Sequence, residues 1–200
     1  MSDTIRTPVQ QRSIDKKNRI IQAGYELFAA HGYFSTNTAA IAKRAGVSTG
    51  IVYGYFHDKK DILVAVLDIY AEHVFSPFLA LFDELRAPID LPAVIDRVLV
   101  MAEDAHRNNA AIHEALNSLT HVDKDVCSKF MALEAEVTQH IVAALRREGL
   151  QCEHLTEKVH WAFESVQSHA HECVFDQHAY IDYSLMRSIE RAQLLKLFDC

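Results

Sequence analysis

The sequence predicts an all-α protein, with an N-terminal three-helix helix-turn-helix domain followed by a larger helical domain. Only six Gly and four Pro interrupt the 200 residues, and half of the residues are hydrophobic. All-β folds need many turns, so this scarcity of turn residues favours long helices. The apolar residues recur at intervals of three and four rather than alternating, which is the periodicity of an amphipathic helix.

The first predicted helix begins near Ser13 or Asp15, since either residue can cap a helix. It ends at Gly32, because glycine readily adopts the left-handed conformation that terminates a helix. Residues 1–13 are largely polar and are predicted to form a flexible basic arm that precedes this helix.

The next segment carries two short helices joined by a tight turn. Asn37 can cap a helix that ends at Gly46, and Ser48 can cap a second helix that extends to Phe56. Two helices linked in this way form a helix-turn-helix, a motif whose second helix fits the major groove of DNA. We therefore assign residues 14–60 to a DNA-binding domain.

Residues 61–200 are predicted to form the larger helical domain. Asp58 and Asp61 have the spacing of a capping box and mark the start of a long helix that continues to Leu85. Further helices are expected to begin at Asp90, Ala110, Asp123, Thr156 and Asp182.

The charge of the chain is divided unevenly. Residues 1–60 carry nine Lys and Arg against four Asp and Glu, whereas residues 61–200 carry eleven against twenty-three. A basic N-terminal segment on an acidic body indicates a polyanionic partner at one end only. This distribution agrees with double-stranded DNA as the partner of the helix-turn-helix.

The second helix of the motif begins with small residues, which allow its backbone to approach the bases. Thr49 can hydrogen-bond to a base edge, and the methyl groups of Thr49 and Ile51 can contact a thymine methyl. Tyr53 and Tyr55 can donate their hydroxyls to phosphates. Lys59 stands at the start of the next helix, where its charge and the helix terminus both favour a phosphate.

Residues 14–63 resemble the DNA-binding domain of the TetR family of bacterial repressors. The resemblance rests on the segment IAKRAGVSTGIVYGYFHDKKDIL, residues 41–63, and on a preceding helix that ends ELFAAHGY. It implies a homodimeric repressor that binds a palindromic operator and is released by a small-molecule effector. It also implies that the last two helices of each subunit form the dimer interface.

The resemblance further assigns roles within the helix-turn-helix. Ala39 and Ala40 stand where many family members carry longer polar side chains, so less DNA contact is expected from the first helix of the motif. The predicted DNA-binding residues are Thr38, Ser48, Thr49, Gly50, Ile51, Tyr53, Gly54, Tyr55 and Lys59.

By the same resemblance, the domain formed by residues 61–200 is expected to bind the effector in a cavity among its helices. The residue types available there favour a largely apolar, aromatic or acyl compound with a polar handle. The predicted pocket residues are Met101, His106, His113, Phe130, Glu134, Trp161, Gln167 and His171.

A metal-responsive regulator stays open as an alternative, because ten of the twelve His lie beyond residue 60. The predicted helix over residues 154–178 carries one polar stripe, formed by His160, Glu164, Gln167 and His171. His169 and Cys173 also lie one turn apart, a spacing that suits a transition metal. A solvated or dimer-contacting polar face accounts for these residues as well, so we predict no bound metal and no cofactor.

An enzymatic role is not expected. Glu103 with His106, and Glu157 with His160, have the Glu-x-x-His spacing of di-iron bundles. A chain so rich in Glu and His produces such pairs by chance, and a di-iron enzyme leaves the helix-turn-helix unexplained. No nucleophile elbow, P-loop or dinucleotide fingerprint occurs in the sequence.

The sequence also predicts a cytoplasmic, nucleoid-associated protein without a membrane partner. No run of about 18 apolar residues is present. The cysteines are widely spaced and show no CxxC pair, so they are expected to be reduced thiols. They are Cys127, Cys152, Cys173 and Cys200.

Overall fold

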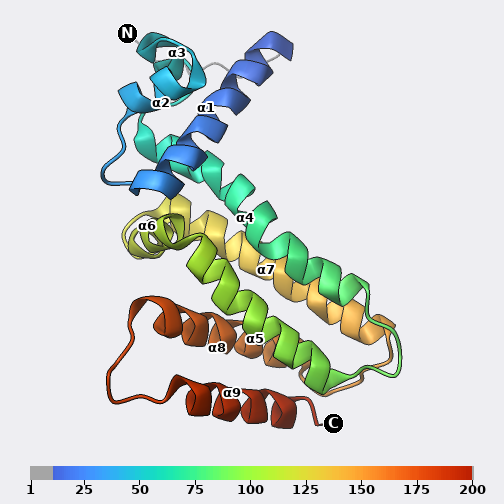
Figure 1. Cartoon of the computed structure of the whole chain (residues 1–200). Coiled ribbons are helices and arrows are strands. Elements are labelled where there is room, and N and C mark those ends of the chain that lie inside the picture. Colours follow the sequence, from blue (N-terminus) through green and yellow to red (C-terminus); the bar gives the residue numbers. More distant parts are fainter. Residues whose placement is uncertain (1–10, 200) are drawn as a thin grey trace. The chain divides into compact units, whose positions relative to one another are not determined.

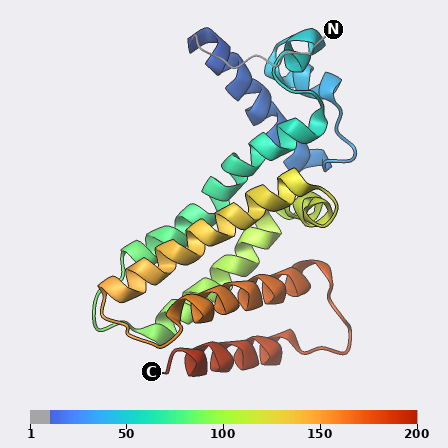
Figure 2. The same cartoon turned by 180° about the vertical axis from the view of Figure 1, so that it is seen from behind.

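The structure, a computed structural model, describes residues 11–199 and contains helices but no strand in that part of the chain, which confirms the all-α prediction. Figures 1 and 2 show these helices from opposite sides. They are α1 (Gln11–His31), α2 (Thr38–Ala45), α3 (Thr49–Tyr53), α4 (Lys59–Asp83), α5 (Leu91–Asn108), α6 (Ala110–Thr120), α7 (Lys124–Arg147), α8 (Leu155–Phe175) and α9 (Tyr183–Leu197). Most of the predicted basic arm lies outside the described residues.

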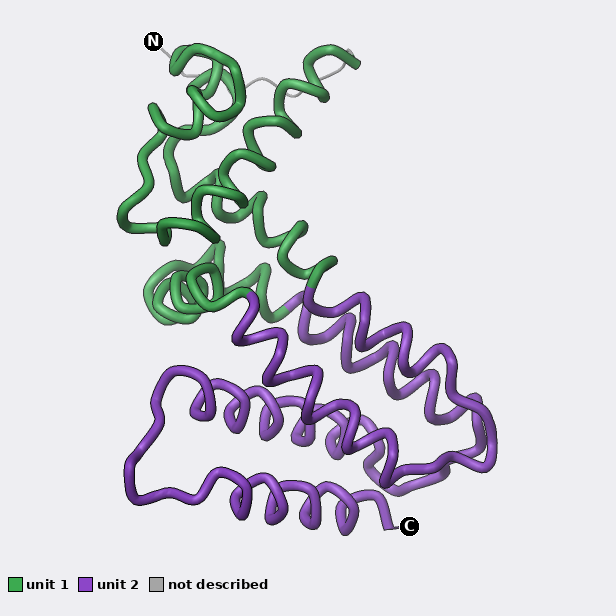
Figure 3. Tube along the Cα trace, in the orientation of Figure 1, with its two compact units in different colours: residues 1–73, 109–131 green, residues 74–108, 132–200 purple. Residues whose placement is uncertain are grey.

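The chain divides into two compact units, which Figure 3 colours separately. Unit 1 comprises residues 1–73 and 109–131, and unit 2 comprises residues 74–108 and 132–200. The limits of the units therefore fall inside α4 and α7 and between α5 and α6.

In unit 1, α1 packs against α2 and α6, and α2 packs against α3. The centre of this packing is apolar, with Ile20, Phe28 and Ile41 fully buried. α1 also approaches α4 closely at Gly24, where an added Cβ would lie 2.7 Å from Cγ2 of Ile62. α1 and α4 can therefore approach this closely only because Gly24 has no side chain.

The caps predicted for the helix-turn-helix are confirmed. The side chain of Asn37 accepts a hydrogen bond from the backbone N–H of Ala40, and Ser48 accepts one from Ile51. Gly46 ends α2 in the left-handed conformation, with φ of 66°. These contacts satisfy backbone groups that would otherwise have no partner at the helix ends.

The second helix of the motif is shorter than predicted. It ends at Tyr53 rather than Phe56, and Gly54 is its C-cap. The backbone N–H groups of Tyr55 and Phe56 both donate to the carbonyl of Val52, which forms a turn directly after the helix. This turn directs the side chains of Tyr55 and Phe56 into the core, where both are buried.

Helix α4 begins as predicted, just after Asp58. The carboxylate of Asp58 accepts from the backbone N–H of Asp61, while the carboxylate of Asp61 accepts from the N–H of His57. By length and composition alone this helix could span a membrane, but 44% of its most apolar window is buried inside the protein. Its apolar residues at the start, including Ile62 and Leu63, are fully buried, as in the core helix of a globular unit.

In unit 2, α5 packs against both α8 and α9, and α8 packs against α9. Their shared core contains Leu99 from α5, Ala170 from α8 and Leu194 from α9. Asp90 and Asp182 cap α5 and α9 as predicted, since each carboxylate accepts from backbone N–H groups of the first helical turn.

Two local predictions are wrong. Thr156 does not cap α8, because the helix already begins at Leu155, preceded by His154 in a left-handed conformation with φ of 57°. Cys127 and Cys173 are free thiols, as expected, but Cys152 is disulfide-bonded. Neither feature has a local signal in the sequence.

The turn between α2 and α3 gives a first test of the structure. Gly46→Ala should lower the free energy of unfolding by about 1 kcal/mol, because alanine is strained in the left-handed region. Gly50→Ala is the matched control, since an added Cβ there would lie 3.9 Å from the nearest atom, Oγ of Ser48. Its free energy of unfolding should be unchanged or higher, because alanine favours a helix. Urea denaturation followed by circular dichroism measures both variants, and equal losses would contradict the left-handed cap.

Candidate nucleic-acid interface and apolar cavity

The exposed side of α3 is formed by its small N-terminal residues and one aromatic ring. Ser48, Thr49 and Gly50 are exposed, and Tyr53 is 53% exposed. The opposite side is anchored by Val52, which is fully buried. An incoming polyanion can therefore reach the backbone at the start of α3 as well as the hydroxyl of Tyr53.

The hydroxyl of Tyr53 is positioned by α2. It lies 3.0 Å from Oγ1 of Thr38, the first residue of that helix, and either group can donate. Two predicted DNA-binding residues from different helices are thus brought together. Ile51 and Gly54 are half-buried, so they offer less surface than Thr49 and Tyr53.

Tyr55 is placed differently from Tyr53. Its side chain is buried, and its hydroxyl lies 2.6 Å from Oγ of Ser13 in α1. This contact ties the segment after α3 to α1. A phosphate contact by Tyr55 stays a prediction and requires its hydroxyl to be shared with Ser13.

Lys59, at the start of α4, makes two hydrogen bonds within unit 1. Its ammonium donates to the carbonyl oxygens of Tyr33 and Thr36, at 2.7 and 2.8 Å. It also lies 4.1 Å from the centre of the Tyr33 ring, within range of a cation–π interaction. Partial burial lowers the pKa of Lys59. Because an ammonium has three N–H groups, one is left to donate to a phosphate.

One further ion pair, between α1 and α2, has no signal in the sequence. Arg44 of α2 donates from Nε to the carboxylate of Glu26 in α1, at 2.6 Å. The guanidinium of Arg44 lowers the pKa of Glu26. These residues are 18 positions apart, so no helical spacing could have predicted their contact.

The helix-turn-helix geometry agrees with a known family. A family model described as bacterial regulatory proteins, tetR family, matches residues 20–66, which include α2 and α3. Residues 20–66 therefore form a helix-turn-helix domain of the TetR family.

Two curated relatives of this chain are transcriptional regulators rather than enzymes. HbdR of Aromatoleum sp. (strain CIB) is 42% identical over 64 residues, which are 30% of this chain and 28% of HbdR. YuxN of Bacillus subtilis (strain 168), an uncharacterized regulator of the helix-turn-helix type, is 26% identical over 165 residues, which are 80% of this chain and 55% of YuxN. The matched segments thus span less than two thirds of either relative.

The likeness in fold covers almost the whole chain. A solved structure of a protein assigned to the TetR family of transcriptional regulators, from Mesorhizobium loti MAFF303099, matches with a TM-score of 0.71. The match covers 94% of this chain and 97% of the other, at 20% sequence identity. The shared fold therefore extends over both units, although most residues differ.

Unit 2 contains an apolar cavity of about 90 Å³. It is bordered by residues from α4, α5, α7, α8 and α9 and by Phe198, which follows α9. Gln167 supplies an amide to a lining that is otherwise apolar. Among the lining residues are Phe75, Phe78, Phe82, Val98, Phe163 and Val166.

Of the eight predicted pocket residues, Gln167 lines this cavity. His113 and Phe130 belong to unit 1, where Nδ1 of His113 lies 3.1 Å from the hydroxyl of Tyr70. Trp161 is 51% exposed on α8. The other four predicted residues belong to unit 2 but do not border the cavity: Met101, His106, Glu134 and His171.

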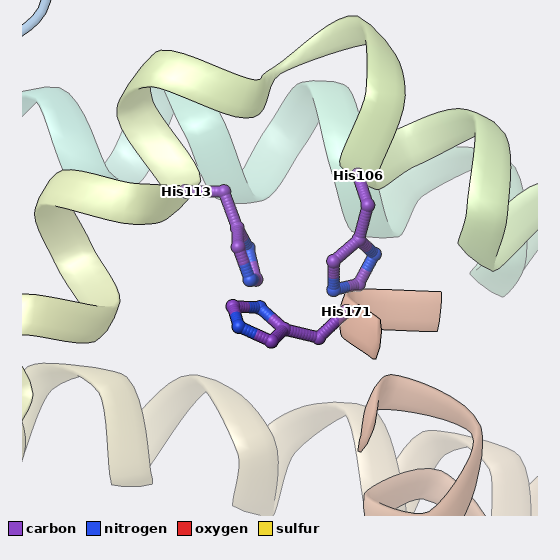
Figure 4. A group of neighbouring side chains, drawn as sticks. All are labelled: His106, His113 and His171. Carbon is purple, nitrogen blue, oxygen red and sulfur yellow. The ribbon is translucent and has the colours of Figure 1, made fainter. Parts of the chain in front are cut away.

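Two of these residues are paired histidines. The rings of His106 and His171 have centroids 6.3 Å apart. Figure 4 labels both residues together with His113, which belongs to unit 1. His106 is buried, and its Nδ1 lies 2.8 Å from the carbonyl oxygen of Ala102. Burial lowers the pKa of His106, so the neutral ring is favoured.

Glu134 of α7 is half-buried in unit 2. Burial raises the pKa of its carboxyl group, and the neighbouring Glu164 raises it further, whereas His160 lowers it. Two residues of the polar stripe predicted on α8, His160 and Glu164, therefore influence the charge of Glu134 on α7. The apolar cavity itself contains no such charged group in its lining.

Proposed function

We propose that this TetR-family chain is a ligand-responsive repressor that binds a palindromic operator as a homodimer. Residues 14–60 act as the DNA-binding domain and residues 61–200 as the sensing and dimerisation domain, with residues 1–13 as a basic arm. The protein acts in the cytoplasm on nucleoid DNA. The observation that carries this proposal is the exposed start of α3, opposite the buried Val52.

The exposed residues of α3 suit contact with a major groove. Small side chains at Ser48, Thr49 and Gly50 allow the helix start to approach base edges, and backbone N–H groups at a helix start favour phosphate. The hydroxyl of Tyr53, held by Thr38, is available for a phosphate or a base. A dimer would present two such helices to successive grooves about 34–36 Å apart.

The DNA-binding proposal is tested by selecting bound duplexes from a random pool and measuring affinity for the selected sequence. We expect a palindrome with half-sites about one helical turn apart, and an affinity that falls steeply with salt. Tyr53→Ala should weaken binding about tenfold, because a positioned hydroxyl contact is lost. Met131→Ala removes a side chain that is 62% exposed outside the helix-turn-helix, and should leave affinity unchanged. Unchanged binding by Tyr53→Ala would contradict the assigned surface.

We further propose that α8 and α9 form the dimer interface. Three large apolar side chains of these helices are about half exposed: Trp161, Leu185 and Ile189. Leu185 and Ile189 are four residues apart on α9, so they lie on the same side of the helix. Large apolar groups exposed together are typical of surfaces that bind another protein.

Ile189→Glu tests this interface. A buried, unpaired carboxylate should raise the dimer dissociation constant about 100-fold or more and weaken operator binding in parallel. Analytical ultracentrifugation measures the first effect and a DNA-binding assay the second. Val122→Glu is the control, because Val122 is 78% exposed and belongs to unit 1, whereas α8 and α9 belong to unit 2. Dimerisation that is equally strong in both variants would place the interface elsewhere.

The apolar cavity of unit 2 is proposed as the effector site. Its aromatic and aliphatic lining favours an apolar group, and Gln167 can hydrogen-bond to a polar handle. At about 90 Å³ it is smaller than a cavity of about 150 Å³ that accepts benzene, so a larger effector must displace side chains. Such displacement gives the effector a means to favour a second conformation that binds DNA less tightly.

Filling the cavity should uncouple the repressor from its effector. Ala162 borders the cavity, and Ala162→Leu adds three carbon atoms there. We expect fatty acids and alkylbenzoates, used as probes, to release the wild-type protein from operator DNA but to act at least about tenfold more weakly on this variant. Ala135→Leu, at an exposed position of α7, should respond like the wild type. Release that is equal in both variants would exclude this cavity as the effector site.

A further inference from the structure

Three side chains of metal-binding type come together in unit 2, outside the apolar cavity. They are Glu103 of α5 and His169 and Cys173 of α8, and one ligand atom from each lies within 4.8 Å of the others. His169 and Cys173 are four residues apart, so one turn of helix places them on the same side. Glu103 comes from a different helix, so the cluster joins α5 to α8.

The distances within the cluster are close to those of a tetrahedral zinc site. Nε2 of His169 lies 3.5 Å from Sγ of Cys173 and 3.9 Å from Oε1 of Glu103. Zinc bonds of about 2.3 Å to sulfur and 2.0–2.1 Å to nitrogen, at a tetrahedral angle, separate these two atoms by about 3.5 Å. The imidazole and thiol are therefore already at the required separation, and the carboxylate needs to move by about half an ångström.

His169 is directed toward the cluster by its burial. The residue is only 4% exposed, and its Nδ1 has no hydrogen-bond partner. Its other ring nitrogen, Nε2, contacts both Cys173 and Glu103. The ring is thus held by packing, with the nitrogen that can bind a metal pointing at two further donors.

We propose that Oε1 of Glu103, Nε2 of His169 and Sγ of Cys173 bind Zn²⁺, with solvent at the fourth position. Thiolate and imidazole favour zinc over Mg²⁺ and Ca²⁺, which prefer oxygen ligands. Cys173 is partly exposed, which gives an ion a route to the site. Binding exchanges the thiol proton of Cys173 for the metal, and the imidazole of His169 binds through Nε2 with its hydrogen on Nδ1.

Zinc binding changes a contact between α5 and α9. Glu103 accepts from Arg187 of α9 through Oε1, at 3.4 Å, and its other oxygen lies 4.0 Å from Arg107. A metal on Oε1 competes with Arg187 and so weakens this link to α9.

The affinity of the site for metal is limited by His169. Because Nδ1 of His169 has no partner, the ring lacks the supporting hydrogen bond that is typically worth 10–100-fold in metal affinity.

The proposal is tested by titrating Co²⁺ into the purified full chain after treatment with EDTA. Co²⁺ replaces Zn²⁺ in tetrahedral sites and gives a near-ultraviolet charge-transfer band when a thiolate binds it. The titration is done without a thiol reductant, so that the disulfide bond of Cys152 stays intact. We expect this band to saturate at one Co²⁺ per chain and to disappear when Zn²⁺ is added.

Two pairs of variants assign the ligands. Cys173→Ser should abolish the band and weaken Co²⁺ binding at least about tenfold, whereas Cys127→Ser, which changes a free thiol of unit 1, should keep both. Glu103→Gln should weaken binding by a similar factor, whereas Glu172→Gln, next to Cys173 but outside the cluster, should not. Circular dichroism and urea unfolding verify that each variant is folded.

Co²⁺ binding is measured without DNA, so its outcome is independent of the proposed repressor function. A wild-type chain that gives no saturable thiolate band overturns the proposal. The same conclusion follows if Cys127→Ser, and not Cys173→Ser, removes the band. In either case Glu103, His169 and Arg187 are left as an internal cluster of polar contacts only.

Discussion

The candidate nucleic-acid interface depends on how α3 is held, and the burial of Val52 holds it. A helix of five residues has no stability of its own, because helix nucleation is unfavourable and few hydrogen bonds repay it. Burial of Val52 fixes the rotation of α3 about its axis, and the left-handed Gly46 fixes the angle at which the chain enters it. The exposure of Thr49 and Tyr53 follows from these two constraints.

Local features of the fold could be predicted from the sequence, whereas contacts between distant residues could not. Asn37, Gly46 and Ser48 act within four residues of their own positions, so their side chains and backbone conformations carry the information. Tyr55 and Lys59 were predicted to contact phosphate on the same local reasoning. In the structure their hydroxyl and ammonium groups also contact α1 and the loop after it, over separations that no periodicity reveals.

The predicted effector pocket illustrates a different limit. Polar and aromatic residues were selected as pocket candidates because they differ from ordinary core residues, and of these Gln167 borders the cavity. The apolar lining has the same residue types and the same helical spacing as a filled core. Whether apolar side chains fill a space or leave it empty depends on packing among five helices, which a single sequence does not specify.

Lys59 connects two segments that lie more than twenty positions apart in the sequence. Its ammonium joins the first turn of α4 to the carbonyls of Tyr33 and Thr36, in the loop that leads into α2. A tilt of α4 therefore carries this loop, and α2 with it, as one mechanical element within unit 1. Acetylation of Lys59, or its replacement by an uncharged residue, would break the link, so that α4 could move without the loop and α2.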